Sequence, residues 1–323
     1  MLTVDADSTP FTSSSDLYPM IITKRRSGSD LRRVRSAAES VTTDTMYSVV
    51  NTDDEESEFY DFSSDVEEAL PSSGSRHGRT ESESEDMLSG IDHLLKGSNA
   101  DKIKAYGLLL EMNEETGGKD AEVLWRLAKV CHLLGSYEES ENNNDKYKQF
   151  IENGVEYGKQ ALDVNSKNAE AHKWFAVNIG SKGKYSNTKE KIQNGYTFKK
   201  HIDEALQLKD DDPILHHLMA RFKYEVAILS RMERQVAKWL FSEVPEGSIS
   251  EAIAGFLKAE ALHVEPWKEN EFLLAKCYIH EKQYQDAAKW LSSALKIPAD
   301  GPQDIKMDKE MNKLLPKYIS YLE

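Results

Sequence analysis

The sequence contains few of the residues that cross-link chains or enter membranes. Only two cysteines occur, Cys131 and Cys277, and both lie within helical patterns of apolar residues. Isolated cysteines in that setting fit buried, reduced thiols better than a disulfide framework or a cysteine-based metal site. No apolar run reaches the roughly 18 residues that a transmembrane helix needs, and the N-terminus lacks the apolar core of a signal peptide. We therefore expect a soluble, cytoplasmic protein with no transmembrane segment.

Residue patterns typical of catalysis are also missing. The histidines are scattered, and no two of them stand four positions apart, as zinc-binding pairs on a helix do. The sequence has no Cys-x-x-Cys pair, no glycine-rich phosphate loop and no nucleophile elbow. We expect no enzymatic activity, no metal site and no cofactor.

Negative charge is concentrated at one end of the chain. The formal net charge is −15, and residues 1–86 contribute −11 of it, from 19 acidic and 8 basic residues. This segment is rich in serine and acidic residues and shows no apolar period, so we expect a disordered tail over residues 1–86. A net negative protein is a poor general binder of polyanions, which requires many lysine and arginine contacts to phosphate. Nucleic acid is therefore not an expected partner.

From Met87 onward the apolar residues recur at helical spacing. One helix is predicted to end at Gly117 and Gly118, and the next to run from an N-cap at Asp120 to about Gly135. No segment alternates β-branched and polar residues in the way that a strand does. The predicted fold class is all-α.

The stretch EFLLAKCYIHEKQYQDAAKWLSSALKIP, near the C-terminus, carries the offsets of a tetratricopeptide helix pair. Ala275 and Ala287 would let the two helices approach closely, while larger residues fill the space to the next pair. EAIAGFLKA repeats the second-helix signature with Ala252, Phe256 and Ala259. It is predicted to be the second helix of an earlier unit.

Two weaker units and a final helix complete the repeat pattern. LWRLAKVCHLLG pairs with NGVEYGKQAL, and AHKWFAVNIG pairs with FKKHIDEALQL. A helix over residues 303–315, placed before Pro316, would cover the last exposed apolar face. We therefore predict a tetratricopeptide-like α-solenoid over residues 87–323, preceded by the disordered acidic, Ser-rich tail.

Four blocks of this domain resemble the regulator of microtubule dynamics family: AHKWFAVNIG, KEKIQNGYTFKKHIDEALQL, RQVAKWLFSEVPEGSISEAIAGFLKAEALHVEP and LLAKCYIHEKQYQDAAKWL. The resemblance covers roughly residues 90–322. It implies a helical repeat protein that associates with microtubules and spindle poles. One vertebrate branch of that family is a mitochondrial outer-membrane protein that tethers mitochondria to the endoplasmic reticulum, and its repeat domain is implicated in phospholipid binding and transfer. This sequence departs from that branch, because no membrane-spanning segment precedes the domain.

Residues 171–201 form a basic interval within an acidic protein. The interval holds Glu190 and seven lysines, for a net charge of +6: Lys173, Lys182, Lys184, Lys189, Lys191, Lys199 and Lys200. Such a patch would meet an acidic partner, such as the tubulin surface or an anionic lipid headgroup. A solvated lysine-rich loop is an equally weighted alternative.

Aromatic residues gather in the middle of the domain. Trp174, Tyr196, Phe222 and Trp239 are candidates for lining a concave groove that accepts a peptide or an acyl chain. Core packing is the commoner role of aromatic residues at helical spacing. Residues 231–241 are amphipathic, which fits an ordinary domain helix better than a membrane-surface helix.

The acidic run DDEESEFYDFSSDVEE, residues 53–68, contains two adjacent aromatic residues. It resembles the motif that docks onto VAP proteins of the endoplasmic reticulum, where acidic residues steer toward a basic face and aromatic side chains insert. The matching residues are Glu58, Phe59, Tyr60 and Asp61. The resemblance departs after Asp61, and phosphorylation of Ser64 would restore a missing negative charge. A chance match within a low-complexity tail carries at least equal weight.

Two further serines of the tail stand in a basic setting. Ser29 and Ser36 each follow an arginine by three positions, Arg26 and Arg33, which is the spacing that basic-directed kinases favour. The alternative is a flexible polybasic arm for microtubules or anionic membranes.

Two functions are consistent with these patterns and with the family resemblance. The first is a non-enzymatic adaptor that associates with microtubules and influences their dynamics at the cytoskeleton, the spindle and the spindle poles. The second is an organelle-contact tether that binds phospholipid in its groove and docks onto VAP proteins through its tail. We favour the first, and expect tubulin as the partner.

Overall fold

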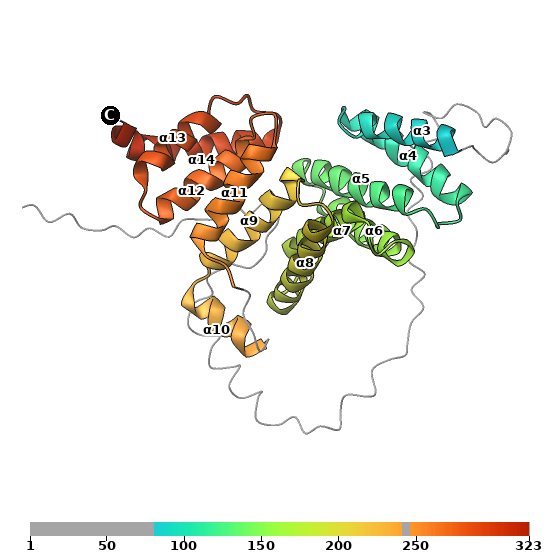
Figure 1. Cartoon of the computed structure of the whole chain (residues 1–323), viewed down its shortest axis with the longest axis horizontal. Coiled ribbons are helices and arrows are strands. Elements are labelled where there is room, and N and C mark those ends of the chain that lie inside the picture. Colours follow the sequence, from blue (N-terminus) through green and yellow to red (C-terminus); the bar gives the residue numbers. More distant parts are fainter. Residues whose placement is uncertain (1–80, 241–245, 323) are drawn as a thin grey trace, which may run out of the picture. The chain divides into compact units, whose positions relative to one another are not determined.

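The computed structural model describes residues 81–240 and 246–322, and Figure 1 draws their arrangement. Each element in these residues is a helix, and no strand occurs among them. In chain order they are α3 (Glu81–Leu94), α4 (Asn99–Glu115), α5 (Ala121–Ser140), α6 (Asn144–Val164), α7 (Ala169–Ser181), the 3₁₀-helix η1 (Lys182–Lys184), α8 (Thr188–Leu208), α9 (Pro213–Ala227), α10 (Arg231–Leu240), α11 (Ile249–Leu262), α12 (Lys268–His280), α13 (Tyr284–Ala294), α14 (Pro302–Tyr318) and the 3₁₀-helix η2 (Ile319–Leu322). The all-α prediction is confirmed for this part of the chain.

The helices pack in consecutive pairs, as predicted for a tetratricopeptide-like α-solenoid. Helix α5 lies against α6, α7 against α8, α9 against α11 and α12 against α13. Each pair then contacts the next, for example through α5 and α7 or through α12 and α14. Ala275 and Ala287 are both 0% exposed, which fits the prediction that they let α12 and α13 approach.

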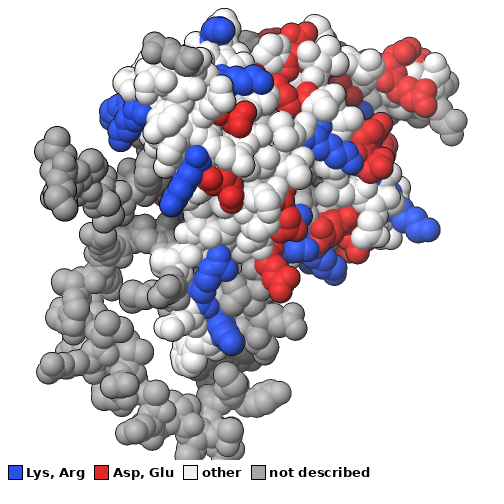
Figure 2. All heavy atoms as spheres, turned by 60° about the vertical axis from the view of Figure 1, so that its left-hand side comes forward, with Lys and Arg blue, Asp and Glu red and all other residues white. Residues whose placement is uncertain are grey.

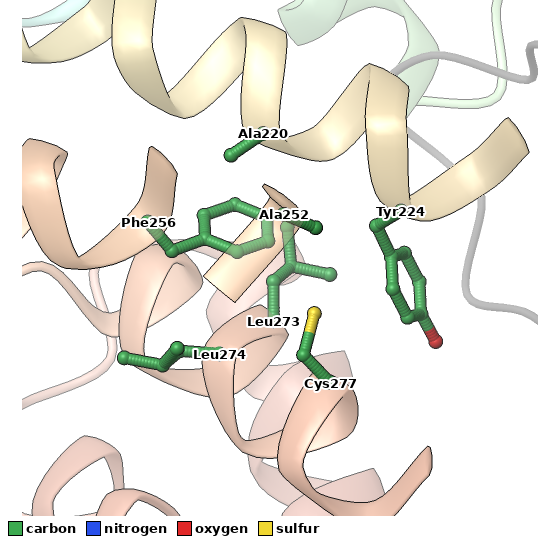
Figure 3. Close-up of a cluster of buried hydrophobic side chains, with 7 residues drawn as sticks. All are labelled: Ala220, Tyr224, Ala252, Phe256, Leu273, Leu274 and Cys277. Carbon is green, nitrogen blue, oxygen red and sulfur yellow. The ribbon is translucent and has the colours of Figure 1, made fainter. Parts of the chain in front are cut away.

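One core cluster joins α9, α11 and α12. Figure 3 shows the buried side chains that these three helices contribute: Ala220, Tyr224, Ala252, Phe256, Leu273, Leu274 and Cys277. The stretch EAIAGFLKA is indeed a second helix, and its first helix is α9, which precedes it across the insert that holds α10. Cys131 and Cys277 are both buried free thiols, as their apolar surroundings in the sequence indicated.

Polar contacts also connect the first helix of each pair to the next one. Four of the five contacts are ion pairs, and the fifth is an amide-to-carboxylate hydrogen bond. They are Asp92–Arg126 (α3 and α5), Glu122–Asn168 (α5 and the N-cap of α7), Lys173–Asp212 (α7 and the N-cap of α9), Arg221–Glu269 (α9 and α12) and Lys268–Asp308 (α12 and α14). The apolar cores are thus accompanied by a continuous series of polar contacts from α3 to α14.

Helix starts followed the capping rules closely. The side chain of Asp120, at the N-cap of α5, accepts a hydrogen bond from the Glu122 amide at 2.8 Å, as predicted. Gly117 and Gly118 follow the end of α4 with φ angles of +62° and +70°, which glycine adopts without steric cost. Helix α3 begins at Glu81, upstream of the predicted domain boundary at residue 87. Its first turn is acidic, which the positive end of the helix dipole favours.

Two predicted helix ends were wrong. Helix α5 does not stop near Gly135 but continues to Ser140. A Cβ atom at Gly135 would lie 3.2 Å from Ile151 Cδ1 of α6, so this glycine provides room for the neighbouring helix. Helix α14 likewise does not end before Pro316, which lies inside its last turn. The proline lacks an amide donor, but the chain remains helical through Tyr318.

Candidate functional site

The basic interval 171–201 falls on three elements, α7, η1 and α8, and its lysines have different surroundings. Lys173 is the most buried of them. Its ammonium group donates to Glu170 at 2.8 Å and to Asp212 at 2.6 Å, with only 5% of the side chain exposed. Because Lys173 faces α9 and not the solvent, we drop it from the candidate surface.

Three more lysines of the interval are held by carboxylates. Lys182 pairs with Glu152 of α6 at 2.6 Å, and Lys184 pairs with Glu139 of α5. The hydroxyl of Tyr185 donates to the same Glu152 carboxylate at 3.0 Å. Burial, followed by the Glu152 charge, raises the pKa of Tyr185, so this hydroxyl remains a donor.

The third paired lysine lies further along α8. Lys199 pairs with Asp203 of the same helix at 2.6 Å, and both side chains are more than a third exposed. Pairs of this kind at i,i+4 contribute only about 0.3–0.5 kcal/mol and open readily.

Lys189, Lys191 and Lys200 have no carboxylate within ion-pair distance among the described residues. Lys189 and Lys200 are exposed and Lys191 is half-buried. Glu190 is the only acidic residue of the interval, and it caps α8, since the amide of Asn187 donates to its carboxylate at 2.9 Å. Glu190 therefore completes a capping box and forms no ion pair with the lysines beside it.

One basic residue of this region was missed from the sequence. Lys148 belongs to α6, outside the basic interval, and its ammonium lies 5.6 Å from the centre of the Tyr185 ring. It is exposed and has no ion pair within the described part of the chain. Tyr185 lies between η1 and α8, so Lys148 of α6 is close to the turn that precedes α8. No sequence signal could have identified this contact, because α6 and the η1 turn are far apart along the chain.

We define the η1–α8 lysine surface as Lys148, Lys189 and Lys191, which carry no carboxylate partner among the described residues. Lys182 and Lys184 lie on the adjoining 3₁₀-turn with their charges already paired. The N-terminal end of α8 adds the partial positive charge of its helix dipole. This surface can attract an acidic group by electrostatics, and its attraction would weaken with added salt.

A second set of unpaired lysines occurs on α14. Lys309, Lys313 and Lys317 are exposed, and no carboxylate pairs with them among the described residues. We refer to them as the α14 lysine stripe. Figure 2 shows that basic and acidic side chains are interspersed on the face that it draws, so that face carries no large surface of one sign.

The four aromatic residues predicted to line a groove have different environments. Trp174 and Phe222 are core residues with 9% and 2% of their surface exposed, and the Phe222 ring stacks on Phe198. Tyr196 is half-buried on α8. Trp239 of α10 is 81% exposed. Two of the four, Trp174 and Phe222, thus pack between helices in the core.

The amphipathic segment 231–241 forms α10 up to Leu240. Arg234 attaches this helix to the end of α9, because its guanidinium donates to the carbonyl oxygens of Val226 at 2.8 Å and Ala227 at 3.0 Å. Both carbonyls belong to the last turn of α9, and that of Val226 also accepts from the Leu229 amide at 3.3 Å. Helix α10 is therefore bound to the domain through Arg234.

The sites predicted in the tail lie outside the described residues. These are the VAP-type motif residues Glu58, Phe59, Tyr60 and Asp61, and the phosphorylation candidates Ser29, Ser36 and Ser64.

Within the described residues, no helix is long and apolar enough to cross a bilayer. In the same residues, no group of three or more histidine, cysteine, aspartate or glutamate side chains is arranged to bind a metal ion.

Comparison with known proteins gives one consistent family. A family model described as "Regulator of microtubule dynamics protein 1-3" matches residues 87–319. Regulator of microtubule dynamics protein 1 of Bos taurus is 35% identical over 237 residues, which is 72% of this chain and 71% of that protein. The protein of the same name from Caenorhabditis elegans is 36% identical over 64% of this chain and 90% of its own length.

In other relatives the match covers only about half of the relative's own length. Regulator of microtubule dynamics protein 3 of Xenopus laevis is 34% identical, and the match covers 71% of this chain but only 49% of that protein. Among solved structures, a thermophilic TPR protein of Thermus thermophilus aligns with a TM-score of 0.47 and 15% identity, over 72% of this chain and 98% of that chain.

Proposed function

The chain belongs to the regulator of microtubule dynamics family, and on that premise we propose that it is a non-enzymatic protein that associates with microtubules and influences their dynamics. A domain of paired helices supports a binding role, because repeat folds act by presenting surfaces to partners. The proposal extends to the cytoskeleton, the spindle and the spindle poles as the places where the protein acts.

The observation that carries this proposal is the η1–α8 lysine surface. The tubulin surface and its glutamate-rich tails are acidic, so a microtubule attracts cations over a wide area. Lys148, Lys189 and Lys191 can meet such a surface without first losing a carboxylate partner within the described part of the chain. Lys182 and Lys184 would have to exchange Glu152 and Glu139 for the new partner, which cancels much of the gain.

Cosedimentation with polymerised tubulin tests the proposal. The variant carrying Lys148→Gln, Lys189→Gln and Lys191→Gln removes three charges and keeps side chains of good helix propensity. Exposed ion pairs contribute about 0.2–1 kcal/mol each, so we expect binding to weaken roughly tenfold. Binding of the unaltered chain should also fall as the salt concentration rises.

The matched control is the triple variant Lys309→Gln, Lys313→Gln and Lys317→Gln of the α14 lysine stripe. It also removes three positive charges, at exposed positions of another helix. We expect it to sediment with microtubules as the unaltered chain does. Equal losses in both variants would mean that net charge alone decides binding, and absence of binding by the unaltered chain would refute the proposal outright.

A further inference from the structure

The three lysines of the η1–α8 lysine surface stand around the start of α8. Lys189 and Lys191 lie within the first turn, two positions apart, so they project about 200° from each other around the helix axis. Lys148 reaches the same region from α6, since its ammonium lies 5.6 Å from the centre of the Tyr185 ring, and Tyr185 shortly precedes α8. These cations therefore surround the beginning of a helix and do not form one flat patch.

Helix geometry directs both lysines of α8 toward the start of that helix. The Cα–Cβ bonds of an α-helix tilt toward its N-terminus, so the side chains of Lys189 and Lys191 lean toward the N-terminal end from opposite sides. The partial positive charge of the helix dipole lies between them. A chain that crosses this end can contact both ammonium groups, whereas a flat surface can lie against only one side of the helix.

Carboxylates are interspersed with these lysines. Glu190 lies between Lys189 and Lys191 in the sequence and is exposed. Glu152 of α6 keeps 41% of its side chain exposed, although it is paired. A broad acidic surface would be brought against these carboxylates as well as against the lysines, and like charges in contact are unfavourable. A narrow acidic chain can contact the lysines and leave the carboxylates in water.

The same region offers no apolar anchor to a partner. Neither residues 144–152 nor residues 182–191 contain an exposed large apolar side chain. Contacts between folded proteins usually bury apolar and aromatic residues at their centre, and a few such residues supply most of the affinity. Attraction at the η1–α8 lysine surface must therefore depend on charge, which suits a partner that carries charges along its whole length.

We infer that the η1–α8 lysine surface binds an extended, glutamate-rich chain and not a folded acidic surface. The inference rests on the proposed function, and it identifies the glutamate-rich tails of tubulin as the part of the microtubule that this protein contacts. Residues of an extended chain are about 3.3–3.6 Å apart, so successive carboxylates can pair with Lys148, Lys189 and Lys191 without a fixed register. Because each exposed pair contributes little, several must form together, and affinity should rise with the number of glutamates.

Cosedimentation of the full chain with microtubules, before and after subtilisin has removed the tubulin tails, tests the inference directly. Removal of the tails should weaken binding at least about tenfold, to the level that the variant Lys148→Gln, Lys189→Gln and Lys191→Gln shows on intact microtubules. Equal binding to intact and digested microtubules would overturn the inference and leave the proposed function in place. Absence of binding to both would instead refute the proposed function, and this inference with it.

Binding of a labelled peptide of about ten glutamates provides the second measurement, without microtubules. Fluorescence anisotropy should show at least about fivefold weaker binding by the triple variant of the η1–α8 lysine surface than by the unaltered chain. The triple variant of the α14 lysine stripe loses as many charges and should bind the peptide normally. A glutamine peptide of equal length should not bind, because it carries no charge to attract the lysines.

The number of glutamates gives a further comparison. A peptide of about five glutamates should bind at least about threefold more weakly than the longer one, since fewer ion contacts form at once. Matching thermal melts of the two triple variants would exclude unfolding as the cause of a loss. Equal binding of the longer glutamate peptide by both triple variants, or no binding by the unaltered chain, would overturn the inference.

Discussion

Lys173 of α7 and Asp212 at the N-cap of α9 form an ion pair of 2.6 Å in which only 5% and 6% of the two side chains are exposed. Asp212 also accepts from the Ile214 amide at 2.8 Å, which caps α9. Burial raises the pKa of the Asp212 carboxyl. The Lys173 charge and the hydrogen bonds lower that pKa by more than burial raises it, so the pKa lies below its usual range. One side-chain pair thus joins two helix pairs and starts the next helix.

Replacing Lys173 by methionine should destabilise the domain strongly. The substitution leaves the Asp212 carboxylate buried beside the α7–α9 contact without its main partner, which typically costs about 3–5 kcal/mol. The double variant Lys173→Met with Asp212→Asn removes both charges and keeps a side chain that caps α9, so it should recover part of the loss. Urea unfolding measures both. A single variant within about 0.5 kcal/mol of the unaltered chain would show that the pair does not stabilise the fold.

Gly158 should not tolerate even a methyl group. A Cβ atom there would lie 2.9 Å from the backbone Cα of Phe175, where α6 and α7 are in direct contact. Alanine favours a helix over glycine by about 1 kcal/mol, yet overpacking costs about 1–3 kcal/mol, and here the obstacle is backbone that cannot move aside. We expect Gly158→Ala to lower the melting temperature.

Gly90 provides the matched control for this substitution. It is also a helical glycine, on α3, but an added Cβ atom would have nothing within 4 Å. Gly90→Ala should therefore stabilise the domain by about 0.5–1 kcal/mol. If both alanine variants raised the melting temperature, the close approach of α6 and α7 would not be as the structure describes it.

The repeat pattern was predictable because it depends on residues close together in sequence. Ala275 and Ala287 mark both helices of one pair, and Asp120 marks a helix start by a rule that involves its next few residues. Gly135 misled the prediction because its neighbour is not local. A glycine in a helical pattern often marks the end of the helix. Gly135 has a different role, because Ile151 of the following helix occupies the space where its side chain would be.

The candidate site was only partly predictable for the same reason. The lysines of residues 171–201 are visible as a charge cluster, but their partners come from elsewhere in the chain. Three lysines of the cluster are already paired with carboxylates: Lys184 with Glu139, Lys182 with Glu152 and Lys173 with Asp212. None of these three carboxylates lies within residues 171–201. Charge along a sequence indicates where lysines are, and only the packing of helices indicates which of them are unpaired.

His132 should make stability depend on pH between about 6.5 and 4. Burial, followed by the positive charge of Lys184, lowers the pKa of His132 to about 4. A histidine whose pKa is lower in the folded than in the unfolded chain contributes its full stability above pH 6.5. That contribution is lost as the pH falls toward the folded value, because unfolding then takes up a proton. The total loss is about 3 kcal/mol.

The variant His132→Gln isolates this contribution. Carboxylates and His201, whose pKa is also lowered to about 4 by burial and by His172, act in both proteins and cancel in the comparison. Urea unfolding from about pH 7.5 to about pH 4.5 should show a smaller decline for the variant, by about 1–3 kcal/mol. Parallel pH profiles for the two proteins would rule out a neutral, buried His132 as a source of the dependence.

Removing the partner of Lys182 should strengthen microtubule association, which is a sharper test than a loss of binding. Glu152 holds Lys182 at 2.6 Å on η1, the turn that precedes α8 with Lys189 and Lys191. Glu152→Gln frees the Lys182 charge while its amide oxygen still accepts from Tyr185. Because the Lys182–Glu152 pair is partly exposed, at 26% and 41%, its removal should cost little stability.

The expected gain is about threefold in cosedimentation, corresponding to one exposed ion contact of roughly 0.7 kcal/mol. Glu156→Gln is the matched control, because Glu156 lies one turn further along α6, is exposed and, among the described residues, accepts only from Gln160. Both variants change the net charge equally, but only Glu152→Gln releases a lysine beside the η1–α8 lysine surface. Equal gains in the two variants would attribute binding to net charge, whereas a gain confined to Glu152→Gln would place the microtubule contact at the start of α8.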